Sequence, residues 1–478
     1  MVDLSTGNIT LPWLTWFQTT ANSNGTNSPT TPNINLLWSK TNTGEAIYSS
    51  PIFVPNFSSA SYSGPVFIYQ SWDWYLYVVD AYTGNTIWRY AFGGPNYGRC
   101  QYLNTGTSQY IYGASHEGYI YCLDQNGTRL WAVPNLYYRE NTGTAYYNGA
   151  GLFTDGSKNW ATNSFCGNGD NANINVGGVV TTMDSCSGSN FTVASTGGLT
   201  AGNYGYIITP LYASDIYYQH AGESSLESGN PYLYISGFDN QIIKINAIYG
   251  SIVWKFATLQ NCEPYPIIFT DATGRLVCAA VSVDANIYLL DAATGALLHT
   301  LKCGGGFDGF IRYGTIKGTN DVYVVAGCRD GRIYSVNTTT GTIDASSTVF
   351  TQPSGLGIDT GIVLVPNGDG TSDFIMADWP GDLVRLDYSM NIKWRVTLGF
   401  TVRSTPLLIT VRGIKYVMVC DMSGDVLFYT LDGNLRSKYY IKGSIEGTPW
   451  IGDIGDKNLS ACITSNDGTV NLIQIVGI

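Results

Sequence analysis

Residues 367 to 373 form the stretch whose composition most strongly suggests a chemical site. The sequence NGDGTSD places oxygen-bearing side chains at Asn367, Asp369 and Asp373 around two glycines. Hard cations such as calcium take oxygen ligands from tight loops of this kind. The sequence therefore predicts one of two things: a calcium site, which would make calcium the one possible cofactor, or a polar hairpin between two strands that binds no metal.

Other candidates are aromatic or acidic. Trp72 and Trp74 flank an aspartate in SWDW and could stack on a sugar ring, or could pack in the core. Asp308 and Glu45 lie just before apolar strands and could face a central channel. Neither has a histidine or a second carboxylate that the sequence can pair with it, so general acid-base chemistry is unsupported. Without a Gly-x-Ser-x-Gly, phosphate-loop or zinc-protease motif, we predict no catalytic residue and no enzyme.

The ten cysteines are an even number, which is compatible with disulfides in an oxidising compartment. No two form a Cys-x-x-Cys pair, and three well-separated histidines make a structural zinc site improbable. A bond from Cys166 to Cys186 would close a modest loop. The other pairings considered are Cys262 with Cys303 across two repeats, and Cys100 with Cys122 within one repeat.

The composition argues against several kinds of partner. Charged residues make up 12% of the 478, the formal net charge is -11 and the pI is near 4.7. Nucleic-acid binding needs a basic surface, so no nucleic-acid partner is expected. No run of about 18 apolar residues exists, so no membrane-spanning helix is expected. The abundant Tyr, Ser, Thr and Asn predict a polar, hydroxyl-rich and amide-rich surface instead.

The elements that must position these residues belong to a repeated cassette, seen most clearly in Asp80 to Trp88 (DAYTGNTIW). Gly84 supplies the positive φ that its turn requires, and a Trp follows in the return strand. Later copies include FDNQIIKINAIYGSIVW, DANIYLLDAATGALLH and PGDLVRLDYSMNIKW. The Trp recurs at Trp38, Trp88, Trp131, Trp254 and Trp394, and His299, Ala345 and Ser437 replace it elsewhere. A flat side chain recurring at one place predicts packing between neighbouring units, and His299 is expected to be structural.

The two ends of the repeat array complement each other. Ile34 to Trp38 (INLLW) is a return strand without preceding strands, and the last unit, NDGTVNLIQI, lacks a return strand. Pairing them closes a ring and removes the open edges. Without an interruption of about 80 residues, eight units of about 45 residues fill residues 39 to 478, which suits four-stranded blades. We predict an all-β fold, an eight-bladed β-propeller of antiparallel blades over 33–478, with seven blades as the alternative.

Two segments depart from the repeat. An insertion at about 135–230 is rich in Gly, Asn, Ser and Thr; it could bind a ligand, be inert, or hide a ninth blade. Residues 1–32 form a polar tail or linker with an apolar patch, Leu11 to Phe17. This tail could pack on its own propeller or could dock on a neighbouring subunit by strand addition.

The cassette, an apolar strand followed by Asp-x-x-Thr-Gly-x-x-x-Trp, resembles the quinoprotein (PQQ-like) propeller repeat. The resemblance implies the propeller fold and a Trp that packs against the next blade. Family enzymes hold a quinone on the axis, with calcium, a catalytic Asp and often a disulfide between adjacent cysteines. This chain has no Cys-Cys pair and no recognisable ligand motif, so it resembles the scaffold members instead. The loop at Asn367 also resembles the calcium loop of integrin-type propellers, except that Val365 stands where the first carboxylate belongs.

These features together predict a non-enzymatic extracellular propeller that is a structural, assembly or adhesion component of a surface layer, filament or virion. The expected partners are further copies of the chain or other surface or virion proteins, reached through the N-terminal tail, and also glycans. The alternatives are a diverged quinone-dependent dehydrogenase and a carbohydrate-binding propeller that uses the insertion and the SWDW tryptophans.

Overall fold

The computed structural model describes residues 33–477, except 42–43, 97, 116–117, 135–141, 158–172, 178, 188, 210–218, 228–229, 238–239 and 351–356. The chain forms two compact units. The first comprises Met1–His116, Ile120–Val133 and Tyr218–Ile478, and the second comprises Glu117–Tyr119 and Pro134–Tyr217. Within the described part of the chain, no helix has the length and apolarity needed to cross a membrane.

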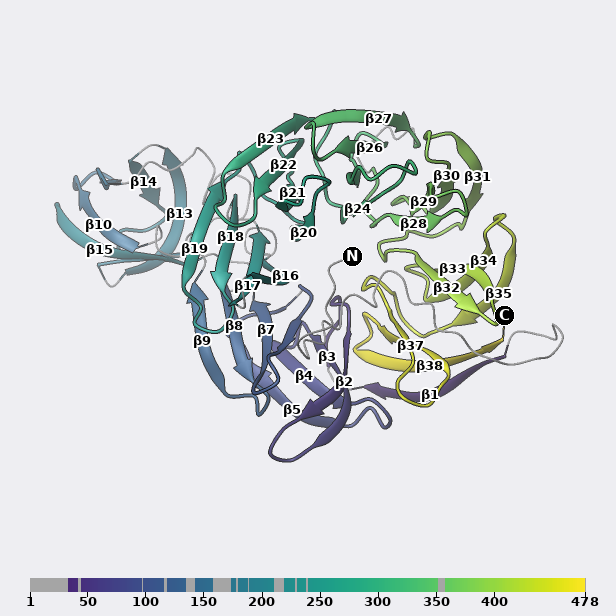
Figure 1. Ribbon diagram of the computed structural model, residues 1–478. Coiled ribbons are helices and arrows are strands. Elements are labelled where there is room, and N and C mark those ends of the chain that lie inside the picture. The colour runs from purple at the N-terminus through teal and green to yellow at the C-terminus, as the bar shows by residue number, and fades with distance from the viewer. Residues whose placement is uncertain are drawn as a thin grey trace. The chain divides into compact units, whose positions relative to one another are not determined.

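The first unit contains eight four-stranded antiparallel sheets, which follow one another around a ring (Figure 1). Blades 1 to 3 are β2 (Ile52–Ser58), β3 (Ser63–Gln70), β4 (Tyr75–Asp80) and β5 (Thr86–Ala91); β6 (Gln101–Asn104), β7 (Gln109–Ser115), β8 (Tyr119–Asp124) and β9 (Arg129–Pro134); β16 (Gln219–Glu227), β17 (Asn230–Gly237), β18 (Gln241–Asn246) and β19 (Ile252–Ala257). Blades 4 and 5 are β20 (Ile267–Thr270), β21 (Leu276–Val281), β22 (Asn286–Asp291) and β23 (Leu297–Lys302); β24 (Arg312–Gly314), β25 (Tyr323–Gly327), β26 (Arg332–Asn337) and β27 (Thr342–Thr348). Blades 6 and 7 are β28 (Val363–Pro366), β29 (Ser372–Ala377), β30 (Asp382–Leu386) and β31 (Ile392–Thr397); β32 (Leu407–Val411), β33 (Ile414–Cys420), β34 (Asp425–Thr430) and β35 (Leu435–Tyr440).

The eighth blade joins the two ends of the chain, in the order β1 (Asn33–Thr41), β38 (Thr469–Gly477), β37 (Leu459–Thr464) and β36 (Trp450–Gly452). Strand β1 pairs antiparallel with β38, and Trp38 lies opposite Leu472. The predicted eight-bladed propeller, with its ring closed by the N-terminal strand, is thereby confirmed.

Burial follows the position of each strand in its blade. The second strands β25 and β29 are buried at every position, and the third strands β22 and β34 at all but their last. Both faces of these strands pack against neighbouring blades, which explains their near-continuous apolar sequences. The fourth strand lies at the sheet edge and buries few positions, as β19 does. The apolar core is therefore a set of clusters between successive sheets.

The recurring tryptophans dock each blade on the next. The Trp38 ring lies against Gly84, and its Nε1 donates to the Ala81 carbonyl oxygen at 3.0 Å. The same docking repeats for Trp88 on Gly127, Trp131 on Gly250, Trp254 on Gly295 and Trp394 on Gly433. Each of these glycines has a positive φ, so the turn needs glycine both for its conformation and for the room that the indole takes. The predicted interblade role of the five tryptophans is confirmed.

The three units that lack the Trp each have a physical explanation. His299 packs against Gly341 in place of a Trp ring, as predicted. Opposite Ala345, the next turn carries Met390 instead of glycine, and the Met390 side chain is buried in the cluster that Ala345 contacts. Ser437 faces the eighth blade, where the third and fourth strands come from opposite ends of the chain and no turn connects them.

The second unit is a closed six-stranded barrel inserted between blades 2 and 3, not a ninth blade. Its strands are β10 (Thr142–Tyr147), β11 (Leu152–Thr154), β12 (Asn173–Val176), β13 (Val179–Ser187), β14 (Asn190–Val193) and β15 (Gly202–Thr209). Phe153 stacks between Tyr147 and Phe191, with ring centroids 4.4 and 5.0 Å away. Although the segment contains few apolar residues, it gathers them into a core of its own.

Candidate functional site on the propeller axis

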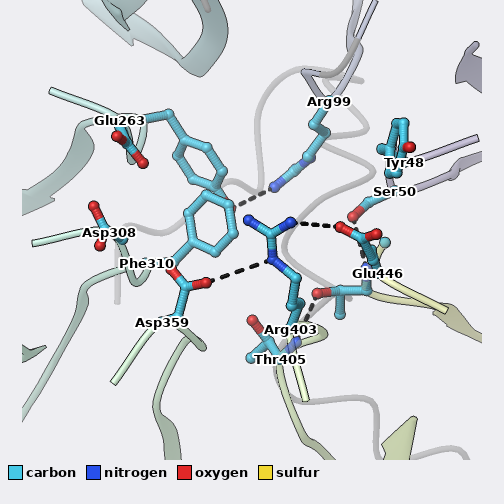
Figure 2. A pocket seen from close by; sticks show the side chains of 13 residues that line it. Tyr48, Ser50, Arg99, Glu263, Asp308, Phe310, Asp359, Arg403, Thr405 and Glu446 are labelled. Atoms are coloured by element: carbon cyan, nitrogen blue, oxygen red, sulfur yellow. Dashed lines mark hydrogen bonds and ion pairs between the residues drawn. The ribbon is translucent and has the colours of Figure 1, made fainter. Parts of the chain in front are cut away.

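One position recurs at the start of seven of the eight blades and carries a charged or phenolic side chain, just before the innermost strand. These residues are Tyr48, Arg99, Glu263, Asp308, Asp359, Arg403 and Glu446. They line one pocket although they come from seven different blades, which is possible only around the ring axis (Figure 2). In most copies the preceding residue, such as Ile358 or Ile445, is fully buried and anchors the backbone.

Arg403 lies at the centre of one half of the pocket. Its guanidinium reaches Glu446 at 2.7 Å and Asp359 at 3.5 Å, so it joins carboxylates from the blades on either side (Figure 2). The indole of Trp379 lies beneath it, 4.7 Å from ring centroid to guanidinium carbon. Asn466 donates to the other oxygen of Glu446 at 2.6 Å. These contacts fix the direction of the arginine and give both carboxylates a partner.

Arg329 has the matching role in an adjoining cavity, which shares four of its lining residues with this pocket: Glu263, Asp308, Asp359 and Arg403. It makes a two-pronged ion pair with Asp308, in which Nη2 lies 2.6 Å from Oδ1, and it lies 3.8 Å from Glu263. Burial and the neighbouring Asp308 charge raise the pKa of Glu263 to about 8, so its surroundings favour the protonated form of this carboxyl. Burial, followed by the Asp308 charge, raises the pKa of Asp359 to about 6 despite its arginine partner.

Aromatic rings form the remaining walls. Tyr265 and Phe310 pack together with centroids 4.8 Å apart, and Arg99 Nη1 donates to the Tyr265 hydroxyl at 3.0 Å. On the other side the Tyr48 ring meets the edge of Trp72 at 5.3 Å. The pocket therefore combines planar charged groups with apolar ring surfaces.

A belt of hydroxyl groups holds the blades together beside this pocket. The backbone N–H of Gly361 donates to Thr405 Oγ1, the N–H of Thr405 donates to Thr448 Oγ1, and the N–H of Thr448 donates to Ser50 Oγ, at 2.9 to 3.1 Å. Each bond crosses from one blade to the next. The first strands of four blades are thus tied at the axis, and the pocket walls are preorganised.

Of the two acidic residues predicted to face the axis, Asp308 and Glu45, the structure places one in the pocket. Asp308 lines the pocket as expected, but Glu45 does not: its side chain is exposed, and Tyr48 holds the pocket position in that blade. Trp72 contacts the pocket wall through Tyr48. Trp74 is half exposed and has φ +74°, at a turn position where five other blades have glycine.

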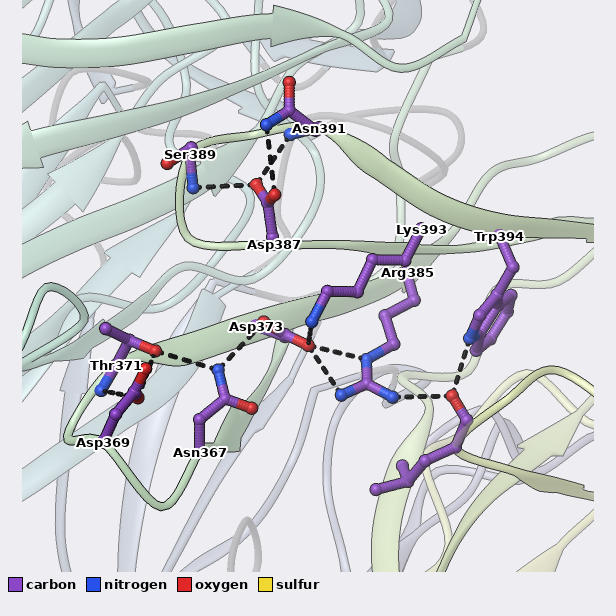
Figure 3. Close-up of polar contacts among 11 residues, drawn as sticks. Asn367, Asp369, Thr371, Asp373, Arg385, Asp387, Ser389, Asn391, Lys393 and Trp394 are labelled. Carbon is purple, nitrogen blue, oxygen red and sulfur yellow. Dashed lines mark hydrogen bonds and ion pairs between the residues drawn. The ribbon is translucent and has the colours of Figure 1, made fainter.

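The loop from Asn367 to Asp373 forms a hairpin between β28 and β29 (Figure 3). Asp373 is buried, and its Oδ2 lies 2.6 Å from both Arg385 and Lys393. Its Oδ1 accepts a hydrogen bond from Asn367 Nδ2, and Asp369 accepts from Thr371 instead of facing the others. Burial opposes ionisation, but these three donors hold the pKa of Asp373 below its ordinary value. The described residues contain no trio of His, Cys, Asp or Glu placed to hold a metal, and the calcium hypothesis remains a prediction.

The predicted disulfides differ from the structure. Four of the cysteines involved are buried and form no disulfide: Cys100, Cys122, Cys262 and Cys303. The pairings of Cys262 with Cys303 and of Cys100 with Cys122 are therefore wrong. Cys262 packs in the apolar cluster of Trp254, whereas Cys303 packs in a different cluster with Phe307. The pairing of Cys166 with Cys186 lies outside the residues and side chains that the structure describes.

Sequence reasoning missed most of the pocket, although a signal is present. In FDGF, IDTG, VRST and IEGT a buried apolar residue precedes the charge and an innermost strand follows. Aligning the starts of the blades, rather than their Trp cassettes, would have placed Glu263, Asp359, Arg403 and Glu446 around one axis.

Comparison with known proteins agrees with the fold. Eight four-stranded sheets closed by the two chain ends define an eight-bladed β-propeller. Residues 177–361 match the family model described as outer membrane protein assembly factor BamB. These residues are thus similar to PQQ-like, BamB-type propeller repeats.

Solved structures show the same architecture at low sequence identity. BamB from Moraxella catarrhalis is 15% identical, with a TM-score of 0.54 over 93% of this chain and 100% of that one. Quinohemoprotein alcohol dehydrogenase from Comamonas testosteroni is 12% identical, with a TM-score of 0.57 over 93% and 77%. A beta-alanine-activating enzyme from Danio rerio is 30% identical over 105 residues, which are 21% of this chain but only 8% of that protein.

The quinone cofactor of the resembling dehydrogenases does not fit this pocket. That cofactor is a polycarboxylate, and here it would meet four carboxyl groups: Glu263, Asp308, Asp359 and Glu446. Two of the three arginines at or beside the pocket, Arg329 and Arg403, are already engaged by those same carboxylates. A bound polyanion would therefore face these carboxyl groups and would have to compete with them for both arginines.

Proposed function

We propose that this chain is a non-enzymatic β-propeller that works outside the cytoplasm as a structural, assembly or adhesion component of a surface layer, filament or virion. The observation that carries the proposal is the pairing of the axial charges. Asp359 and Glu446 each contact Arg403 of the blade between them, and Asp308 contacts Arg329 of its own blade. Carboxylates held in such pairs have oxygen atoms already occupied by a guanidinium, which leaves fewer lone pairs free to take a proton from a substrate.

The outer edge of the closing blade supports the assembly part of the proposal. Strand β1 pairs with β38 on one side and is the outermost strand of its sheet. Leu36 and Leu37 on this strand are 50% and 41% exposed. An exposed apolar edge strand is a template for strand addition by another chain. The apolar patch Leu11 to Phe17 in the tail of a second copy is the partner we propose for it.

The experiment compares the oligomeric state of three proteins by light scattering and negative-stain imaging. Wild type is expected to form filaments or lattices, and Trp13→Ser/Trp16→Ser in the tail and Leu36→Ser/Leu37→Ser on β1 are each expected to give monomers. A matched control is Ile414→Ser, at an equally exposed apolar residue on a second strand, which should assemble like wild type. A wild-type protein that is monomeric at all concentrations would refute the assembly proposal.

The dehydrogenase alternative is tested separately. Wild-type protein is incubated with the quinone, calcium and a panel of alcohols and sugars, and oxidation is followed with an artificial electron acceptor. We expect no turnover and no spectral change of the quinone. Turnover that is lost in Arg329→Gln would overturn the non-enzymatic proposal.

A further inference from the structure

The axial pocket is a built cavity whose walls come from seven blades, so its shape depends on the whole ring. The hydroxyl belt through Ser50, Thr448 and Thr405 ties the walls from four of these blades together, and the Trp docking fixes the blades farther out. Such a cavity pays little ordering entropy when a ligand enters. It is also where the aromatic rings and the polar groups of the blade starts converge, which is the usual composition of a small-molecule site.

The charges of the pocket balance when Glu263 is protonated. Three carboxylates (Asp308, Asp359 and Glu446) then stand against three arginines, of which Arg99 and Arg403 line this pocket and Arg329 lines the adjoining cavity. A cationic ligand would be repelled by the arginines, and an anionic ligand by the carboxylates. The pocket carries no net charge that a charged ligand would neutralise.

The same groups form a dense array of planar hydrogen-bonding functions. Carboxylates accept and guanidinium groups donate, each through two atoms in one plane. Adjacent hydroxyl groups on a ring match such two-atom partners, because each hydroxyl both donates and accepts. A ligand with several neighbouring hydroxyl groups can bridge the existing ion pairs without breaking the charge balance.

The ring surfaces favour the same class of ligand. Phe310 and Tyr265 offer half-buried to buried aromatic walls, and Tyr48 stands against the edge of Trp72 on another side. The carbon-bound hydrogens of a pyranose ring form an apolar face that packs on an aromatic ring, while its hydroxyl groups point outward from the ring edge. Few other neutral molecules combine an apolar face with a polar edge in this way.

We propose that the axial pocket binds a neutral, polyhydroxylated ring, namely a single uncharged sugar residue at the end of a glycan. Phe310, with the buried Tyr265 packed behind it, takes the face of the sugar, and the ion pairs of Arg329 and Arg403 take its hydroxyl groups. The inference deepens the adhesion part of the proposed function and rests on it for its biological setting. It also moves the expected sugar contact from the SWDW tryptophans to the axis.

The test is saturation-transfer NMR and calorimetric titration of the full chain with defined sugars. Galactose, mannose, glucose and N-acetylglucosamine are the neutral probes, and glucosamine and glucuronate are their charged counterparts. At least one neutral sugar should bind, and both charged sugars should bind at least tenfold more weakly. Phe310→Ala and Arg403→Gln should each weaken binding at least fivefold, whereas Tyr388→Ser, at an exposed site outside the pocket, should leave it unchanged.

The outcomes separate this inference from the proposed function. If no neutral sugar binds, or if binding is equal in wild type and Phe310→Ala while thermal unfolding shows that both are folded, the sugar inference is overturned and the assembly proposal still stands. Tighter binding of a charged sugar overturns the inference as well. Cleavage of a bound oligosaccharide would support the pocket assignment and overturn the claim that the protein is non-enzymatic.

Discussion

The contact between Gly84 and Trp38 makes ring closure open to a direct measurement. Gly84 has φ +69°, and a Cβ built on it would lie 2.6 Å from Trp38 Cε3 and 2.8 Å from Lys40 Cγ. Gly84→Ala therefore has two separate costs. A non-glycine residue in the left-handed region costs about 1–2 kcal/mol, and forcing the indole away costs about 1–3 kcal/mol of overpacking. The expected loss of unfolding free energy is about 2–5 kcal/mol.

The chain offers a matched control for the first cost. Gly106 has φ +84°, but a Cβ there would meet nothing within 4 Å. Gly106→Ala should lose only the conformational term of about 1–2 kcal/mol. The difference between the two variants isolates the steric part of the docking between the closing blade and the first blade.

A double-mutant cycle completes the experiment. Trp38→Ala alone should cost about 3–5 kcal/mol, because it empties a buried aromatic site and removes the Nε1 hydrogen bond to Ala81. In that background Gly84→Ala no longer meets the indole, so its cost should fall to that of Gly106→Ala. The coupling energy should be about 1–3 kcal/mol.

The assay is urea unfolding followed by far-UV circular dichroism, which does not depend on the deleted tryptophan. Equal midpoints for Gly84→Ala and Gly106→Ala would refute the reasoning. So would additive costs in the double mutant, because they would mean that the indole and the turn do not constrain each other.

Three further outcomes follow from other contacts. Ala345→Trp combined with Met390→Gly should recreate the missing docking and be at least 1 kcal/mol more stable in urea unfolding than the less stable of the two single variants, because each single change overfills or empties the same space. Asp373→Ala should cost about 3–5 kcal/mol by the same assay, since it leaves Arg385 without its carboxylate in a partly buried site. Burial raises the pKa of Glu263 to about 8, so the folded state holds a proton that the unfolded state releases near pH 4.5. Stability should therefore fall between about pH 5 and 8, and Glu263→Gln should flatten that decline in thermal unfolding measured across the range.

The sequence predicts the ring because its strongest signals are local and repeated. Each blade's cassette, a turn glycine such as Gly84 followed by a Trp in the return strand, can be recognised within about ten residues of sequence. Ring closure can be predicted because each end of the array is an incomplete blade: Ile34 to Trp38 lacks its preceding strands, and the final strand lacks a return strand to pair with. Even the absent Trp at Ser437 follows from closure, because the blade that it faces has no connecting turn.

The axial pocket follows a different logic. Its residues are separated by about one blade each, and a single charge before a strand carries no local signal. Only the closed ring places Arg403 between Asp359 and Glu446. The barrel was missed for a related reason: Phe153 and Phe191 are far apart in a polar segment, and they meet only when β11 pairs with β14.

The blades are held together at two distances from the axis, and this arrangement explains where the chain can vary. Indole docking fixes neighbouring sheets near their outer strands, and the hydroxyl belt through Thr405 fixes them at the inner strands. Neither constraint involves the axial side chain that follows the buried apolar residue at the start of a blade. That side chain is Glu, Asp, Arg or Tyr in different blades of the same ring. Specificity in such a propeller therefore resides in the seven axial side chains and in the exposed strand edges, because these are the positions that ring stability does not determine.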